Sequence, residues 1–115
     1  MTRVVAAQLG PSIGDLEANR ALALAAIRDA VNAGADVVVL PELITSGYMF
    51  ASAEEAASAA IAADHEILRE WAAEAAQADI LLAGGFCELG EDGRVYNSAA
   101  IFARSPLRSK IAALL

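Results

Sequence analysis

The sequence predicts a single α/β domain with a mixed sheet and helices on one face, and three observations favour that class. Residues 36–40 and 79–86 form unbroken apolar runs, as expected of strands buried in a parallel sheet. Segments with helical spacing of apolar residues precede both runs. An Asp-Gly turn then leads into a further strand, so the expected order of elements is β-α-β-α-α-β-β.

The first half of the chain contains a strand, a helix and the signals that end them. Residues 3–9 are rich in Val and Ala, and Gly10 ends this predicted strand. Asp15 is placed to cap a helix that runs to about Asn32. Gly34 supplies its C-terminal stop, and the strand over 36–40 follows directly.

The middle of the chain predicts a loop and two helices. Residues 41–50 have no clear period and indicate a loop. Ser52 and Glu55 form a capping box, and the helix that they open is expected to break near Asp64. Asp64 is expected to cap a second helix that reaches Gln77, with an apolar stripe of Ile67, Leu68, Trp71 and Ala75.

The last third predicts a hairpin and a tail. Asp92 and Gly93 form the turn, and a strand over 94–102 is expected to run antiparallel to the strand over 79–86. Residues 1–103 make up the predicted domain. Residues 104–115 depart from the pattern, because basic side chains are followed by an apolar end, and they are assigned to an aberrant or truncated tail.

Composition excludes several classes of protein. The chain has 115 residues, 57% of them hydrophobic, so intrinsic disorder is excluded. The net charge of −7 argues against binding to nucleic acid. No apolar stretch has the length of a membrane span, and no signal peptide is visible. A single cysteine excludes an internal disulfide, and we expect no metal and no cofactor. These features predict a cytoplasmic protein.

Glu42 is the most informative polar residue. It stands two positions beyond the strand over 36–40, and functional groups of open α/β sheets gather at the carboxyl ends of parallel strands. A half-buried carboxylate there would have a raised pKa, which prepares a general base. The alternative is an ordinary loop carboxylate that bonds a neighbouring amide.

The residues around Glu42 resemble the first signature of the nitrilase, or carbon–nitrogen hydrolase, superfamily. Other segments are similar to that family in the same order, and the resemblance covers residues 3–103. The similar segments are VVAAQL (4–9), GDLEAN (14–19), AGAD (33–36), VVVLPEL (37–43), SGY (46–48), GGF (84–86) with Glu88, and YNSA (96–99).

The resemblance implies the N-terminal part of an α-β-β-α sandwich from an enzyme that hydrolyses non-peptide C–N bonds. Family members use a Glu base, a Lys and a nucleophilic Cys, and only the Glu carries over, onto Glu42. Tyr48 is implied to line the substrate pocket, the alternative being a packed aromatic. The implied partners are a small amide, carbamoyl compound or nitrile and a second copy of the chain. Because family members are longer, the resemblance implies truncation or a frameshift after about residue 103.

Two residues could be mistaken for the missing catalytic groups. Lys110 stands near the place of the family's lysine, but the surrounding motif is absent, so no role is carried over. Cys87 follows a buried strand and lacks an activating His or Lys signature, so we expect a buried structural cysteine. The chain alone is therefore predicted to be inactive. A non-catalytic interaction module and an unrelated small α/β binding domain remain as alternatives.

The other polar candidates are expected to be structural. We expect His65 to be solvated, and Ser46 lacks the nucleophile-elbow pattern. Asn97 is expected to satisfy buried backbone groups, and Glu88 to have a structural role. The missing side chains of residues 84–85 would allow a close backbone approach.

Overall fold

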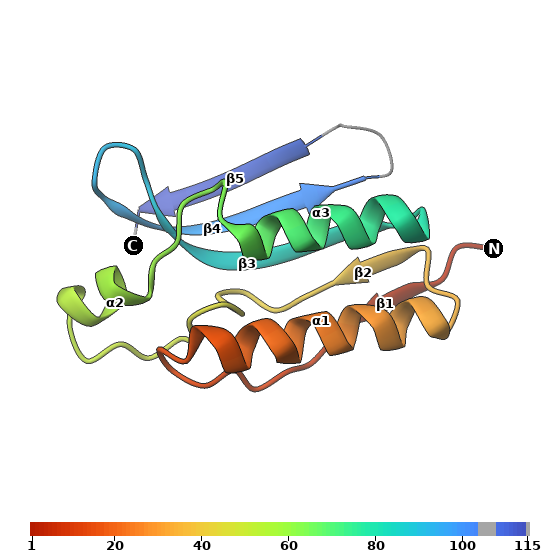
Figure 1. Cartoon of the computed structure of the whole chain (residues 1–115), viewed down its shortest axis with the longest axis horizontal. Coiled ribbons are helices and arrows are strands. Elements are labelled where there is room, and N and C mark those ends of the chain that lie inside the picture. Colours follow the sequence, from red (N-terminus) through yellow and green to blue (C-terminus); the bar gives the residue numbers. More distant parts are fainter. Residues whose placement is uncertain (104–107, 115) are drawn as a thin grey trace.

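A computed structural model describes residues 1–103 and 108–114, which form one mixed sheet with helices (Figure 1). The sheet has five strands in the order β1-β2-β3-β4-β5. The strands are β1 (Val4–Ala6), β2 (Val37–Val39), β3 (Leu81–Leu89), β4 (Val95–Phe102) and β5 (Arg108–Leu114). The helices are α1 (Leu16–Asn32), α2 (Ala53–Ala59) and α3 (Glu66–Ala78).

The pairing of the strands confirms the predicted sheet. β1 pairs with β2 and β2 with β3, both in parallel, whereas β3, β4 and β5 pair antiparallel in sequence. The backbone of β5 lies within the segment that the sequence sets apart as a tail, and it pairs with β4 from Phe102↔Arg108 to Tyr96↔Leu114. The division of the chain at residue 103 remains a prediction.

The core lies between the two long helices and one face of the sheet, as predicted (Figure 1). α3 buries the expected stripe of Ile67, Leu68, Trp71 and Ala75. The largest fully buried side chains include Trp71 and Phe86. Gly84 makes room for the Trp71 ring, because a Cβ on Gly84 would lie 2.6 Å from Trp71 Cζ3. Within residues 1–103 and 108–114, no helix combines the length and the apolar character that crossing a membrane requires.

The first predicted helix is confirmed, and the second is shorter than predicted. Asp15 caps α1 by accepting a 3.1 Å hydrogen bond from the Ala18 amide. α2 is capped by Ser52 as predicted, but it ends at Ala59 instead of near Asp64. The reason is a tertiary contact: Ile61 forms a parallel bridge with β3, in which its amide donates to the Cys87 carbonyl at 2.9 Å and its carbonyl accepts from the Leu89 amide at 2.8 Å.

The cap of α3 is His65 and not Asp64, which corrects two predictions. His65 Nδ1 accepts a hydrogen bond of 3.1 Å from the Ile67 amide. His65 is therefore not simply a solvated residue, since its imidazole satisfies one of the free amides at the helix start. The helix reaches Ala78, one residue beyond the predicted end.

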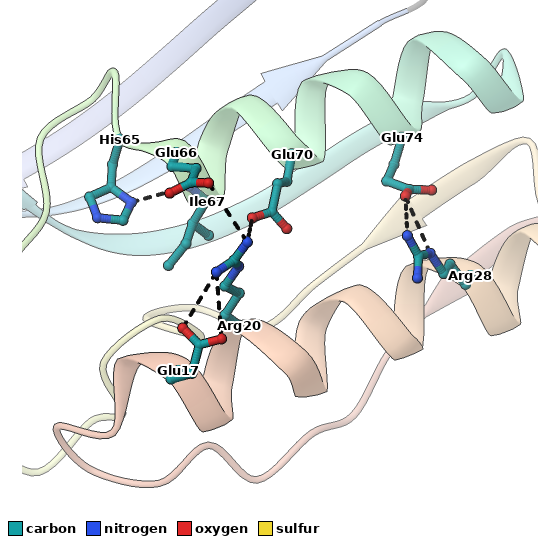
Figure 2. A network of polar contacts seen from close by, with 8 residues as sticks. All are labelled: Glu17, Arg20, Arg28, His65, Glu66, Ile67, Glu70 and Glu74. Atoms are coloured by element: carbon teal, nitrogen blue, oxygen red, sulfur yellow. Dashed lines mark hydrogen bonds and ion pairs between the residues drawn. The ribbon is translucent and has the colours of Figure 1, made fainter.

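Ion pairs join α1 to α3 along the outer surface of the helical layer (Figure 2). Arg20 pairs with Glu70, and Arg28 Nη2 lies 3.0 Å from Glu74 Oε1. Glu17 and Glu66 add weaker contacts to Arg20, at 3.4 and 3.9 Å. Because these groups are partly exposed, each pair contributes little to stability, and the buried core holds the two helices together.

The opposite face of the sheet carries exposed apolar side chains. Val4, Val39 and Leu81 are 60%, 39% and 41% exposed. Among the described residues, α2 and the loop before it lie against part of this face, with contacts to Gly85, Cys87 and Asn97. The uncovered remainder is an apolar patch, here called the open face, of the kind that marks an interaction surface.

The helical layer, not the open face, should carry the stability of the fold. Ile27 is fully buried, so Ile27→Val is expected to lower the free energy of unfolding by about 0.5–1.5 kcal/mol. The same change at the half-exposed Ile13 should lower it by less than about 0.5 kcal/mol. Urea titrations of both variants measure the difference, and equal losses would contradict this account of the core.

Candidate active site

The loop after β2 is held in a strained, tightly bonded conformation. Leu43 has a φ of 49°, in the region that side chains other than glycine rarely adopt. Its side chain is buried, and its carbonyl accepts a 2.8 Å bond from the Gly47 amide. Strain of this kind persists only where the surroundings fix the backbone, and it is common at functional sites.

The backbone of this loop packs directly against Gly85 of β3. A Cβ on Gly85 would lie 2.6 Å from the Cα of Glu42 and 2.7 Å from the Leu43 amide nitrogen. Two 3.2 Å hydrogen bonds cross the contact, from the Gly85 amide to the Pro41 carbonyl and from the Ile44 amide to the Gly85 carbonyl. The predicted close backbone approach is thus confirmed at Gly85, whereas Gly84 receives the ring of Trp71.

Asn19 ties the same loop to the start of α1. This residue is 1% exposed, and its side-chain oxygen accepts a 2.7 Å bond from the Ser12 amide. Its Nδ2 donates to the carbonyls of Ser12 and Thr45, at 2.7 and 3.0 Å. A buried, fully bonded amide rigidifies its surroundings, so the loop that carries Glu42 is anchored from two sides.

The Glu42 carboxylate receives two hydrogen bonds. The Tyr48 hydroxyl donates to Oε2 at 2.6 Å, and the Nδ2 of Asn97 donates to Oε1. Among the described residues, Glu42 makes no ion pair. The carboxylate is exposed. The hydrogen bond from Tyr48 and, to a smaller extent, the one from Asn97 lower the pKa of Glu42 below its ordinary value.

This environment corrects the predicted state of Glu42. We expected a half-buried group with a raised pKa, and the structure has an exposed group with a lowered one. The reason is that the carboxylate stands over the open face, where desolvation is slight and hydrogen bonds to the anion dominate.

Asn97 is the site residue that the sequence analysis missed. Its amide was expected to satisfy buried backbone groups, but it bonds Glu42. Asn97 lies opposite Cys87 in the register of β3 and β4. The hairpin turn at Asp92 and Gly93 could have placed Asn97, because the turn fixes which residues of β3 and β4 pair. In that register Gly85 pairs with Ala99, and Asn97 lies two residues from Ala99 on the same strand.

Glu42 and Tyr48 border a hollow at the carboxyl ends of the parallel strands. The hollow has a volume of about 580 Å³ and is lined by Ala6, Ala7, Gln8, Leu9, Val39, Leu40, Pro41, Glu42 and Tyr48. The Tyr48 side chain is 53% exposed, and its bond to Glu42 raises the pKa of the phenol. This position suits contact with a ligand, and the role of Tyr48 in substrate binding remains a prediction.

The other candidates, Cys87, Ser46 and Glu88, are buried. Cys87 is fully buried, as expected, and its Sγ lies 3.6 Å from the Ala56 carbonyl oxygen. Burial raises the pKa of this thiol, which disfavours a nucleophile. Ser46 is also buried and donates to the Gly47 carbonyl. Glu88 is 3% exposed and accepts a 2.7 Å bond from Ser98.

Lys110 can be placed only by its backbone. Its Cα pairs with Ala100 in the register of β4 and β5, and its side chain lies outside the described part of the chain. No cluster of three or more metal-binding side chains occurs among residues 1–103 and 108–114.

Comparison with solved structures identifies the class of fold. The chain superposes on XC1258 from Xanthomonas campestris, a CN-hydrolase superfamily protein, with a TM-score of 0.82 and 22% identity, over 96% of this chain and 40% of that one. The Caenorhabditis elegans NitFhit protein gives a TM-score of 0.79 and 21% identity, over 100% of this chain and 29% of that one. An N-terminal amidase gives a TM-score of 0.79 and 18% identity, over 95% and 27%.

Sequence comparison then establishes the family. The sequence model of the family described as "Carbon-nitrogen hydrolase" matches residues 3–110, so this chain belongs to the carbon–nitrogen hydrolase family. Over 99 residues it is 33% identical to the glutamine-dependent NAD(+) synthetase of Thermotoga maritima, a match that covers 86% of this chain and 17% of that protein. Over 46 residues it is 48% identical to the corresponding enzyme of Rhodobacter capsulatus, covering 40% and 8%.

The close approach at Gly85 should be indispensable to the site. Gly85→Ala places a methyl group against the Glu42 backbone, so we expect the free energy of unfolding to fall by about 1–3 kcal/mol. The amide resonances of Glu42, Leu43 and Ile44 should shift in a ¹⁵N–¹H spectrum. Gly10→Ala is the matched control, because a Cβ there meets nothing within 4 Å and should change stability by less than about 0.5 kcal/mol. Unchanged resonances in Gly85→Ala would contradict the close contact between Gly85 and the backbone of Glu42.

Proposed function

We propose that this chain supplies the base-bearing part of an amidase-type or carbamoylase-type carbon–nitrogen hydrolase. The observation that carries the proposal is the Glu42 carboxylate, held by two donors beside a hollow at the carboxyl ends of the parallel strands. Substrates of the proposed enzyme are small carboxamides, carbamoyl compounds or nitriles. The names of its relatives, a glutamine-dependent synthetase and an N-terminal amidase, favour carboxamides.

Glu42 would act as the proton carrier of this reaction. Its two hydrogen bonds favour the anion, which is the form that can accept a proton, although they also lower its pKa and so make it a weaker base. It takes the proton of a thiol, and the thiolate attacks the amide carbon. The proton then passes to the leaving amine as the C–N bond breaks. A water molecule next gives a proton to Glu42 and hydrolyses the thioester, and that proton returns to the thiol.

The thiol and the cation of this scheme are implied by the family resemblance and are assigned to no residue of this chain. Cys87 is buried and its Sγ lies 3.6 Å from the Ala56 carbonyl oxygen, so it lacks the exposure of a nucleophile. Without a thiolate and without stabilisation of the oxyanion, each of which contributes orders of magnitude, the chain alone should be inactive.

We also propose a cytoplasmic location and self-association through the open face. The single cysteine is free, which suits a reducing compartment. The exposed side chains of Val4, Val39 and Leu81 give the open face the character of an interface.

The first test of the proposed function is a chimera. This chain replaces the aligned segment of the Thermotoga maritima synthetase, and hydrolysis of glutamine is measured. Glu42→Gln should lower the rate by roughly 10²–10⁴-fold, because the amide keeps the shape of the carboxylate and cannot accept a proton. Glu91→Gln, at an exposed glutamate beside the hairpin turn, should leave the rate unchanged.

Two outcomes would contradict this proposal. A chimera that keeps full activity with Glu42→Gln would remove Glu42 from the mechanism, and a folded but inert chimera would favour the non-catalytic module. The chain by itself should give no hydrolysis of simple amides above buffer. Turnover that disappears on Cys87→Ala would instead make Cys87 the nucleophile.

Self-association is tested by light scattering on the isolated chain. At about 20 µM, where exposed apolar surface drives association, we expect a mass above that of the monomer. Leu81→Lys puts a charge on the open face and should lower the mass. Met49→Lys makes a similar change on an exposed loop residue and should not. A monomer at every concentration would disprove the proposed interface.

A further inference from the structure

The two oxygens of the Glu42 carboxylate are bonded by side chains of unequal rigidity. Asn97, which reaches Oε1, lies inside β4, with Cys87 of β3 on one side and Ala113 of β5 on the other. Tyr48, which reaches Oε2, lies in a loop directly after Gly47, whose φ is 81°. The Tyr48 side chain is half-exposed, and its hydroxyl donates to Glu42.

We propose that Asn97 is a positioning residue that fixes Glu42 through Oε1, and that the Tyr48 hydroxyl is an exchangeable donor that leaves Oε2 free to accept a proton. This inference rests on the proposed role of Glu42 as base and adds a division of labour between its two neighbours.

The chemistry of the two donors supports the division. A carboxamide N–H does not ionise in the working range of a protein, so Asn97 can hold the carboxylate without ever protonating it. A hydrogen bond to the anion stabilises it and lowers its basicity, so a donor that stays on the accepting oxygen opposes the transfer. Tyr48 is half-exposed and lies in a loop, so its side chain is free to turn away from Glu42, whereas the backbone that carries Asn97 is held in a strand paired on both sides.

The position of Tyr48 would allow its hydroxyl, once released from Glu42, to bind a substrate. Tyr48 and Glu42 both line the hollow at the ends of the parallel strands. A polar substrate that enters there can accept a hydrogen bond from the Tyr48 hydroxyl in place of Glu42, so the substrate can take over the donor. Binding would then strip one hydrogen bond from Glu42 and strengthen the base at the moment when a proton must be accepted.

Few groups could disturb this arrangement electrostatically. The segments that pack against Glu42 bring the uncharged Gln8 from beyond β1, Gly85 from β3, Asn97 from β4 and Tyr48 from the loop. Tyr48 is the one titratable group among them. In the described residues no Lys, Arg or His contacts the carboxylate. Changes in the pKa of Glu42 can therefore be read as changes in these two hydrogen bonds.

The first experiment needs no enzyme activity. The pKa of Glu42 is measured by NMR titration of its carboxyl carbon in the 115-residue chain carrying Leu81→Lys, the change that should reduce self-association through the open face. Asn97→Leu and Tyr48→Phe each remove one donor at nearly constant shape, so each should raise the pKa of Glu42. Asn97→Asp, a second variant at that position, should raise it further through like charge. Tyr96→Phe is the matched control and should leave it unchanged, because the Tyr96 hydroxyl bonds Asp92.

The same samples test the difference in rigidity. The Asn97 side-chain amide should have an order parameter near that of rigid backbone, about 0.85, and the Tyr48 ring a value below about 0.6. An unchanged Glu42 pKa in Asn97→Leu would overturn the positioning role. Equal order parameters for the two side chains would overturn the exchangeable role of Tyr48.

The chimera extends the test to catalysis. Asn97→Leu should lower kcat by roughly 10–100-fold with little change in KM, because the base is misplaced. Tyr48→Phe should raise KM more than it lowers kcat. Since Glu42 must be deprotonated to act, a raised pKa moves the acid limb of the kcat/KM profile to higher pH in both variants. A larger loss of kcat in Tyr48→Phe than in Asn97→Leu would reverse the assignment. An inert chimera would count against the proposed function alone, because the NMR titration decides the two contacts independently.

Discussion

The candidate site depends on one close contact, in which the backbone of Glu42 lies directly on Gly85. Any larger residue at position 85 would place its Cβ 2.6 Å from the Glu42 Cα, a distance that packed atoms do not tolerate. The contact sets the height of the loop above β3, and two hydrogen bonds hold the loop there, from the Gly85 amide to the Pro41 carbonyl and from the Ile44 amide to the Gly85 carbonyl. Glu42 then stands within reach of Asn97, one strand further across the sheet. The absence of one methyl group thus determines which strand can supply a donor to the carboxylate.

The sheet could be predicted from the sequence because its signals are local. The apolar runs over 36–40 and 79–86 indicate strands by themselves, and the turn at Asp92 and Gly93 closes the hairpin whatever surrounds it. The end of α2 could not be predicted in the same way. Its sequence favours a longer helix, but Ile61 finds hydrogen bonds on β3 beyond the short β2, and this tertiary pairing overrides helix propensity.

The sequence was enough to predict Glu42 as the principal residue of the candidate site. It was not enough to predict the hydrogen bonds of Glu42 or the direction of its pKa. Glu42 follows from its place after a strand and from the resemblance of its neighbours. The hydrogen bond from Asn97 depends on the register of two strands that are distant from Glu42 in sequence, and no local pattern reports it. The direction of the Glu42 pKa depends on whether the open face is covered. Since the carboxylate is exposed in this chain, its two donors outweigh desolvation.

The topology of the sheet also bears on the order in which the molecule assembles. β3, β4 and β5 are neighbours in the sequence as well as in the sheet, so their pairing closes short loops. In the sequence, α1 separates β1 from β2, and both α2 and α3 separate β2 from β3. Each of these parallel pairs therefore closes a long loop. Long loops cost more entropy to close, so the hairpin region should form first and the parallel pairs last. Because Glu42 follows β2, its carboxylate should meet Asn97 late in folding, after the hairpin that carries Asn97 has formed.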